Sequence, residues 1–449
     1  MAGAMKWEQL VNDKRFGLED YHDPRKCATR TDFRRDYDRL VFSSPFRRLQ
    51  NKTQVFPLPG SIFVHNRLTH SMEVACVGKS MADSIAAELS ARYSANGMPT
   101  EHFAHLGDIV AAACLAHDLG NPPFGHSGER AISTFFSEGA GRHLEAELSP
   151  AEWSDLTHFE GNANALRVLT HQFKGRRKGG FAMTYSTLAS IVKYPFESGL
   201  ATKGKFGFFQ SEKNDFAKVA DELGMLRLSA DGEPLKYSRH PLVYIVEAAD
   251  DICYEVMDIE DAHKLRILST PTVMEAFMNF FPSERQGQMS RVMEHVSDPN
   301  EKIAYLRSCV VGELVQQCAR AFIDNEQAIL EGRFEGSLLA HIGTLARQGY
   351  AACNDISWSH IYRSAEVVDI ELAGNHIITS LMESLCDAVM NPTLNYSRLL
   401  LSKFPEQYDV NAHTPYARIQ AVLDHVSAMT DVYALDLYRK LNGTSLPAV

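Results

Sequence analysis

Two adjacent residues, His117 and Asp118, are the strongest local indication of chemistry in this sequence. An apolar run leads up to them, and a glycine and two prolines follow within five residues. Both side chains are therefore expected to project from a helix C-terminus, where free carbonyls favour a cation. An imidazole with a carboxylate suits Mn²⁺, Fe²⁺, Co²⁺ or Zn²⁺ better than oxygen ligands alone. By itself the pair is a weak indication, because most such dipeptides are surface charges or satisfied core histidines.

Other segments carry ligands of the same kinds. His70 opens a second apolar helix, and Asp250 and Asp251 are consecutive acids in a third helix that is apolar enough to be buried. Buried charges are rarely tolerated without a partner. A cation shared among His70, His117, Asp118 and Asp250 would explain these acids. The alternative is that Asp250 and Asp251 cap a helix or pair with arginines.

The elements that must position these residues are mainly helical. Alternating, strand-like segments are few, and residues 53–63, with Pro-Leu-Pro-Gly, could form a small hairpin. The sequence therefore predicts a mainly α fold with minor β elements. Apolar residues recur at three- and four-residue spacing over residues 71–93, 108–119, 161–173, 237–261 and 302–330.

Composition restricts the surroundings of the protein. The 449 residues are 45% apolar and 22% charged with a net charge of −11, so the surface as a whole should repel nucleic acid and anionic membranes. No run of 18 apolar residues and no secretory signal is visible, and eight scattered cysteines without a C-x-x-C pair fit a reducing cytoplasm. Residues 174–180, KGRRKGG, are basic and glycine-rich. They form either a solvated loop or a contact with nucleic acid or another subunit.

Four segments together carry a family resemblance. They are FRRLQNKTQVF at 46–56, NRLTHS at 66–71, HDLGNPPFGH at 117–126 and FEGN at 159–162. With Asp250, their order resembles the HD phosphohydrolase superfamily and, more narrowly, the bacterial deoxyguanosine triphosphate triphosphohydrolases. The matching blocks extend from about residue 30 to residue 261 and resume weakly at 362–374. The resemblance implies hydrolysis of dGTP, or of other deoxynucleoside triphosphates, to the deoxynucleoside and tripolyphosphate.

The resemblance also implies roles at the reacting phosphate. His70, His117, Asp118 and Asp250 would bind a divalent metal, Mn²⁺, Mg²⁺ or another transition metal such as Fe²⁺, Co²⁺ or Zn²⁺. His126 would act at the α-phosphate, with Glu129 three residues on as its orienting carboxylate. Ser127 could cap the helix that begins there. A histidine beside a helix start could instead merely cap the helix or fill space.

Substrate contacts follow from the same resemblance. Tyr254 would pack on the deoxyribose, and Asp258 and Gln54 would read its 3′-hydroxyl. Asp250, Tyr254 and Asp258 are spaced i, i+4, i+8 and so share one helix face, although Tyr254 could also be a core residue.

The triphosphate needs cationic contacts, because cleavage at the α-phosphorus releases all three phosphates together. The candidates for these contacts are Arg67, Lys193 and Lys205, of which the two lysines resemble the family's phosphate-binding lysines. The sequence contains no Walker-type phosphate loop.

The resemblance finally suggests an organisation and partners. We expect an N-terminal arm at 1–30, an HD phosphohydrolase core at 31–270 and a helical extension at 271–449 that packs on the core as one large domain. A cytoplasmic homo-oligomer, commonly a hexamer, is implied, with single-stranded DNA or a nucleotide as effector and no membrane. Two alternatives stay open: another HD-class nucleotidase or phosphodiesterase, and a non-enzymatic nucleotide sensor.

Overall fold

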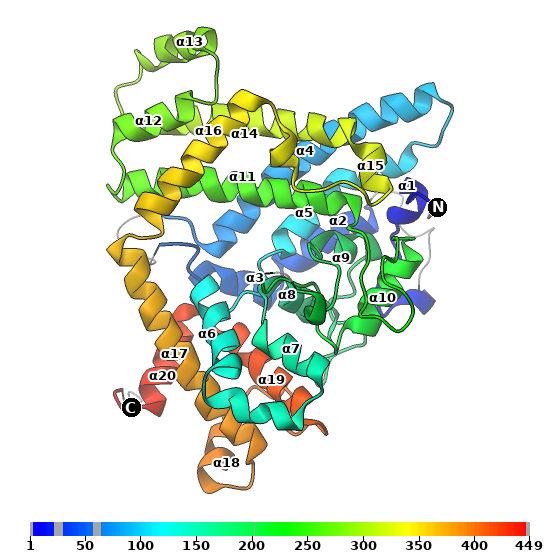
Figure 1. The fold of residues 1–449 in the computed structure, drawn as a ribbon, viewed down its shortest axis with the longest axis vertical. Coiled ribbons are helices and arrows are strands. Elements are labelled where there is room, and N and C mark those ends of the chain that lie inside the picture. Colours follow the sequence, from blue (N-terminus) through cyan, green and yellow to red (C-terminus); the bar gives the residue numbers. More distant parts are fainter. Residues whose placement is uncertain (1–2, 22–29, 57–63, 202, 446–449) are drawn as a thin grey trace.

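The computed structural model describes residues 3–21, 30–56, 64–201 and 203–445, and its architecture is mainly α (Figure 1). In these ranges β pairing is limited to isolated bridges, such as the one between Thr53 and Asn66. The predicted mainly α class is thus confirmed. The hairpin expected at 53–63 falls largely on residues 57–63, which lie outside the described residues.

Two long helices begin where local sequence signals place them. Helix α4 (Arg67–Ala95) starts after Asn66, whose side chain and that of Thr69 each accept a hydrogen bond from the other residue's backbone amide. Helix α11 (Pro241–Lys264) has a proline at its first position, where no amide hydrogen is needed. In both helices an amide of the first turn is either hydrogen-bonded to a side chain or absent, and this fixes where the helix begins. The positions of the site residues on each helix follow from that start.

The other helices of the N-terminal half are α1 (Trp7–Leu10), α2 (Asp32–Val41), α3 (Ser44–Arg48), α5 (Leu106–Ala116), α6 (Gly125–Ser137), α7 (Pro150–Thr157), α8 (Gly161–Thr170), α9 (Tyr185–Ile191) and α10 (Lys213–Glu222). The C-terminal half contains α12 (Thr270–Met278), α13 (Ser283–Met293), α14 (Pro299–Asp324), α15 (Glu326–Leu330), α16 (Thr344–Ile356), α17 (Ala365–Met390), α18 (Asn395–Leu401), α19 (Pro415–Ser427) and α20 (Asp431–Leu441). Short 3₁₀ segments lie at Glu19–Tyr21, Leu49–Asn51, Glu101–His105, Ala140–Glu147, Ser198–Leu200 and Leu338–His341, and a π-helical turn lies at Ser357–Ile361.

Helix α5 is the centre of the larger apolar core. It packs against α2, α4, α9 and α11, and Ile109, Val110 and Leu115 have no exposed surface. Burying a side chain of this size stabilises the fold by about 1.5–3 kcal/mol. The uniformly apolar sequence of α5 reflects contacts on all sides, and it delivers His117 to the interior at the helix end.

A second apolar cluster brings the C-terminal part of the chain back to the site. Helix α17 packs along α6, and α19 packs on α17, although α6 and α17 are more than 220 residues apart in sequence (Figure 1). Helix α14 meanwhile packs on α4 and α11. The predicted division at residues 30 and 270 stays a prediction. None of the described helices combines the length and apolarity needed to cross a bilayer.

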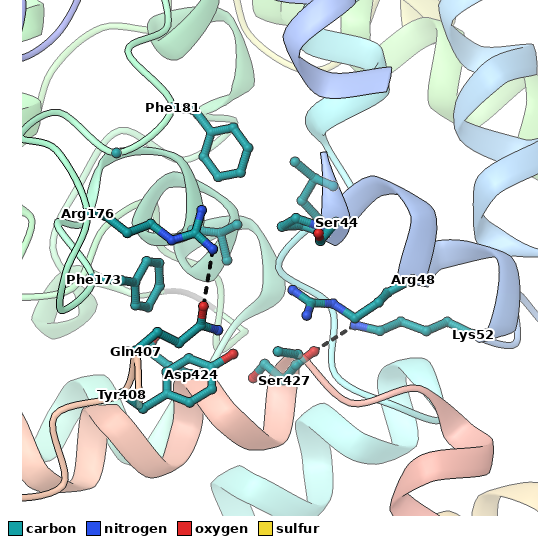
Figure 2. A pocket seen from close by; sticks show the side chains of 15 residues that line it. Ser44, Arg48, Lys52, Phe173, Arg176, Phe181, Gln407, Tyr408, Asp424 and Ser427 are labelled. Carbon is teal, nitrogen blue, oxygen red and sulfur yellow. Dashed lines mark hydrogen bonds between the residues drawn. The ribbon is translucent and has the colours of Figure 1, made fainter. Parts of the chain in front are cut away.

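A buried lysine ties these parts together. The Nζ atom of Lys52 donates to the backbone carbonyl of Asn121 at 2.5 Å. It also donates to that of Ser427 at 2.6 Å (Figure 2). Burial, together with the nearby positive charge of Arg67, lowers the pKa of Lys52 to about 7. Lys52 therefore joins the turn after α5 to the end of α19.

Candidate active site

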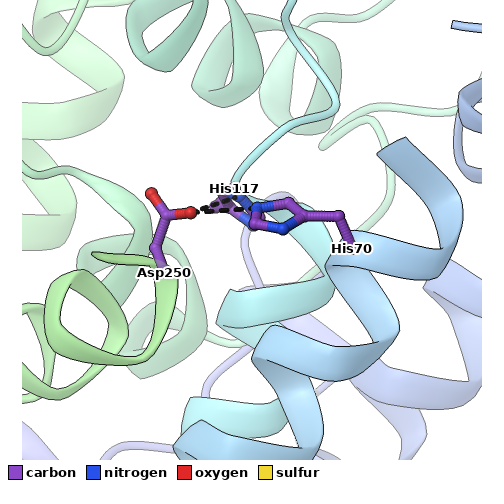
Figure 3. Close-up of side chains that lie close together, drawn as sticks. All are labelled: His70, His117 and Asp250. Carbon is purple, nitrogen blue, oxygen red and sulfur yellow. Dashed lines mark hydrogen bonds and ion pairs between the residues drawn. The ribbon is translucent and has the colours of Figure 1, made fainter. Parts of the chain in front are cut away.

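Three side chains from three helices converge on one point (Figure 3). His70 comes from the first turn of α4, His117 caps the C-terminus of α5, and Asp250 lies in α11. The Oδ1 atom of Asp250 is 3.0 Å from Nε2 of His70 and 3.5 Å from Nε2 of His117. The candidate ligand atoms of all three residues lie within 4.8 Å of one another, a spacing at which one ion could bind them all.

The hydrogen bonds of His117 suit a metal ligand. Its Nδ1 atom donates to the carbonyl of Cys114 at 2.6 Å, which leaves Nε2 facing the cluster as the ligand atom. That Nε2 atom is buried and has no hydrogen-bond partner among the described residues. Although burial lowers the pKa of His117, the carboxylates of Asp118 and Asp250 raise it to about 9. The two carboxylates thus favour a positive charge at this point, and a divalent ion bound at Nε2 of His117 would supply it.

Asp118 is beside this cluster and is held by two donors. Arg67 donates to its Oδ2 at 2.7 Å, and the side-chain amide of Asn121 donates to its Oδ1 at 2.5 Å. Oδ1 also lies 3.6 Å from Nε2 of His117. The group of three that meets the spacing above does not include Asp118. Its part as a fourth ligand stays a prediction. The alternative for Asp250 and Asp251 is pairing with arginines; at this cluster, among the described residues, the acid that pairs with an arginine is Asp118, with Arg67.

A pocket of about 280 Å³ opens beside the three ligands. Ten of the twelve predicted site residues line it, and the other two, His70 and Asp258, are not among its lining residues. The lining residues are Gln54, Arg67, His117, Asp118, Asn121, His126, Glu129, Glu160, Asn162, Lys193, Tyr194, Lys205, Asp250, Asp251 and Tyr254.

His126 and Glu129 form a hydrogen-bonded pair at this pocket. The His126 Nδ1 atom is 2.8 Å from Oε2 of Glu129, and the His126 side chain is 62% exposed, so its other nitrogen can reach a substrate. Glu129 is buried, and its Oε1 accepts the backbone amide of Gly161 at 2.8 Å. Burial raises the pKa of Glu129, but the bond from His126, Lys205 and the Gly161 amide together lower it to about 2. Glu129 is therefore a carboxylate throughout the neutral range.

Gly161 allows this arrangement by having no side chain. A Cβ atom at this position would lie 1.8 Å from Oδ1 of Asn121 and 2.7 Å from Oε1 of Glu129. Any other residue at 161 would push these side chains apart. The glycine in the FEGN segment is thus required by close packing.

One local expectation about this turn is wrong. Ser127 does not cap α6; the helix begins at Gly125, and Ser127 lies inside it with its hydroxyl donating to the carbonyl of Glu371. The reason is the backbone at Phe124, which precedes the helix with φ of +61° in the left-handed region. This turn makes α6 begin at Gly125, before Ser127. Asp431 of α20 stabilises the turn by accepting a hydrogen bond from the Phe124 amide at 2.9 Å.

Two lysines reach the pocket from loops. Nζ of Lys193 is 3.2 Å from Oε1 of Glu247, and Nζ of Lys205 is 2.7 Å from Oε1 of Glu160. Burial lowers the pKa of each lysine, but the neighbouring carboxylates outweigh it and raise both values. Both lysines are therefore ammonium ions at neutral pH.

The predicted sugar residues meet a partner from the C-terminal part of the chain. The ring of Tyr254 stacks on that of Tyr362, with centroids 6.0 Å apart and planes at 22°. The Tyr362 hydroxyl donates to Oδ2 of Asp258 at 2.9 Å. The Oε1 atom of Gln54 is buried with no hydrogen-bond partner among the described residues, as expected of a group that awaits a ligand.

Sequence reasoning gave no role to several residues that shape this site. Tyr362 lies at the start of the weakly matching block at 362–374, so the sequence did contain an indication of its role. Nothing in the sequence indicated a role for Asp431, which accepts hydrogen bonds from the backbone amides of Thr53 and Phe124. Glu160, in the FEGN segment, lines the pocket beside Lys205.

The fold and this site agree with comparisons to known proteins. Residues 67–225 match the HD domain, and residues 346–440 match the phosphohydrolase-associated domain. A protein of Synechocystis sp. named deoxyguanosinetriphosphate triphosphohydrolase-like is 35% identical, over 98% of this chain and 100% of its own. A Pseudomonas aeruginosa protein of the same name is 36% identical over 99% and 100%, and the deoxyguanosinetriphosphate triphosphohydrolase of Yersinia enterocolitica is 30% identical over 98% and 99%.

The helical core and the cluster of His70, His117 and Asp250 within it are those of a hydrolase of the HD phosphohydrolase class. Within that class, relatives of this identity extend over nearly the whole chain. The chain belongs to the deoxyguanosinetriphosphate triphosphohydrolase family.

Proposed function

We propose that this protein hydrolyses dGTP, and other deoxynucleoside triphosphates to a lesser extent, to deoxynucleoside and tripolyphosphate in a reaction that depends on a divalent metal ion. The observation that carries the proposal is one pocket that adjoins the His70–His117–Asp250 cluster and also contains the His126–Glu129 pair. The names of the relatives supply the substrate.

The charges of the pocket support the need for a divalent ion. Among the described lining residues, Asp118, Glu129, Glu160, Asp250 and Asp251 are acidic, whereas Arg67, Lys193 and Lys205 are the only lysines or arginines. A triphosphate would therefore meet more carboxylates than cations, and like charges repel strongly at contact distance. An added divalent ion would cancel the excess of two negative charges among these residues.

His70, His117 and Asp250 would hold that ion, with Asp118 as the predicted fourth ligand. A bound divalent ion would supply Lewis-acid activation of the phosphate and of water. Mn²⁺ and Mg²⁺ are the first candidates, followed by Fe²⁺, Co²⁺ and Zn²⁺.

His126 and Glu129 would manage the proton at the α-phosphorus. Water forms the new bond to that phosphorus, the bond to the 5′-oxygen breaks, and the proton lost by water is balanced by one gained by the 5′-oxygen. An imidazole whose Nδ1–H is fixed by Glu129 presents its Nε2 atom toward the pocket. This is the geometry of an acid–base group oriented by a carboxylate.

Lys193, Lys205 and Arg67 would bind the phosphates, and Tyr254 would pack on the deoxyribose. Gln54 and Asp258 would read the 3′-hydroxyl, for which the unpartnered Oε1 of Gln54 is available.

We further propose that the protein forms a homo-oligomer, with a hexamer as the family precedent. We also propose that single-stranded DNA or a nucleotide acts as an effector. The proposed organisation is a core at 31–270 with an extension at 271–449.

Product analysis tests the function. Purified protein is freed of metal with a chelator and incubated with dGTP, with and without Mn²⁺ or Mg²⁺, and the products are separated by anion exchange. We expect deoxyguanosine and tripolyphosphate only when metal is restored. Formation of dGMP and pyrophosphate, or equal turnover without metal, would overturn the proposal.

A further inference from the structure

A second pocket, of about 180 Å³, is lined in part by Lys52 (Figure 2). Its walls come from α3, from residues 168–181, from residues 407 and 408, and from the end of α19. The Nζ atom of Lys52 already donates to two carbonyls, of Asn121 and Ser427, so this lysine is engaged by the protein itself. The pocket shares no lining residue with the active-site pocket.

Arg48 is the unusual group of this second pocket. Its side chain is half-buried, and it has no hydrogen bond or ion pair with any residue in the described part of the chain. Burial lowers the pKa of Arg48, and the nearby Arg176 lowers it further. Two guanidinium groups that face one space repel each other, and an anion between them would relieve this repulsion. Figure 2 shows both guanidinium groups directed into the pocket from opposite sides.

The acidic residue nearby does not neutralise these arginines. Asp424 lines the pocket, but both its oxygens accept from Arg167, each at 2.8 Å. Among the described residues, Arg176 has one weak acceptor, the side-chain carbonyl of Gln407 at 3.2 Å. Within that part of the chain, Arg48 and Arg176 thus have no carboxylate partner, although the whole chain has a net charge of −11.

The remaining walls are apolar and partly aromatic. Phe173, Phe181 and Tyr408 present their rings to the space (Figure 2). The basic segment at 174–180 is not a free loop at its start, because the amide of Lys174 donates to the carbonyl of Gln407 at 3.1 Å. Arg176 is thereby held beside the aromatic rings. Arginine forks bind phosphate oxygens in pairs, and aromatic walls favour flat rings.

We propose that this second pocket binds a small aromatic phosphate monoester, with the phosphate between Arg48 and Arg176 and the ring against Phe173, Phe181 and Tyr408. The inference is independent of the proposed reaction, because none of these residues belongs to the catalytic machinery.

Phenyl phosphate is the simplest probe of this proposal, with inorganic phosphate and phenol as its two halves. Binding is measured by isothermal titration calorimetry on the full-length protein loaded with metal. We expect saturable binding of phenyl phosphate that is tighter than binding of either half. Removing one charged hydrogen-bond donor in Arg176→Gln or Arg48→Gln should weaken binding about ten-fold or more.

Three controls make the test decisive. Arg177→Gln removes an exposed arginine next in sequence that does not line the pocket, so it should change the dissociation constant less than two-fold. Lys205→Gln, in the active-site pocket, should also leave phenyl phosphate binding unchanged. Arg48→Gln should not lower the melting temperature, since Arg48 makes no hydrogen bond or ion pair with the described residues; loss of an arginine that holds the fold together would lower it.

The opposite results would overturn the proposal. These are absence of saturable binding to the wild type, unchanged binding in Arg176→Gln, or loss of binding in Lys205→Gln, which would place the anion in the active-site pocket. Turnover of dGTP, measured in parallel, reports separately on the proposed function.

Discussion

Replacing Glu129 by glutamine tests the proposed acid–base pair at a single hydrogen bond. Glu129 accepts from His126 with one oxygen and from the Gly161 amide with the other, each at 2.8 Å. If the glutamine carbonyl keeps the Gly161 bond, its NH₂ group must face Nδ1 of His126. That nitrogen can then no longer donate, so the imidazole takes the opposite tautomer and presents an N–H at Nε2.

The magnitude follows from the kind of bond that is lost. Because the pKa of Glu129 is lowered to about 2, the wild-type acceptor is a carboxylate at any practical assay pH. A hydrogen bond to a charged group contributes about 1.5–3 kcal/mol. We therefore expect kcat of Glu129→Gln to fall about 10- to 150-fold. His126→Ala, which removes the acid–base group itself, should lose about 10²–10⁴-fold with metal still bound.

The assay is a double-mutant cycle on dGTP turnover. If Glu129 acts through His126, the double variant should be within about three-fold of His126→Ala, because no imidazole is left to orient. Glu138→Gln, an exposed glutamate at the end of the same helix, is the matched control and should retain wild-type kcat. Losses that simply multiply in the double variant, with metal content and melting temperature intact, would refute the orienting role.

Three further predictions concern the metal and the sugar. His117→Ala should abolish bound metal and activity with helical circular dichroism preserved; stoichiometric metal by mass spectrometry would contradict this. A contact that rejects one added hydroxyl should give a preference for dGTP over GTP of about 10²-fold. Tyr254→Ala should narrow this preference. An unchanged ratio of the kcat/KM values for dGTP and GTP would mean that another residue contacts the 2′ position. Tyr362→Phe removes the hydroxyl that holds Asp258 in position, so the preference for dGTP over dideoxy-GTP should fall about ten-fold. If the ratio of kcat/KM for the two nucleotides is the same in both proteins, Asp258 does not read the 3′-hydroxyl.

Local patterns in the sequence predicted the helices well. The predicted helical segment 71–93 lies within α4, and the segment 237–261 overlaps most of α11. The segment 302–330 corresponds to α14 and α15, which are separated at Asn325. Such patterns work because a buried helix face repeats every three to four residues. The start of α6 was misplaced, since the left-handed backbone at Phe124 depends on Asp431, three hundred residues away in the chain.

Long-range partners explain what sequence reasoning missed at the site. The convergence of His70, His117 and Asp250 could be anticipated because their order resembles a known family. The hydrogen bonds from Tyr362 to Asp258 and from Lys52 to Ser427 could not, since these partners are 104 and 375 residues apart in sequence and only tertiary packing brings them together. Single side-chain contacts of this kind leave no periodic signal.

The most direct test of the central claim is to run the reaction with dGTP in ¹⁸O-labelled water and to weigh both products by mass spectrometry. Attack of water on the α-phosphorus places one ¹⁸O atom in tripolyphosphate and none in deoxyguanosine. Label in deoxyguanosine, or label divided between dGMP and pyrophosphate, would contradict the account.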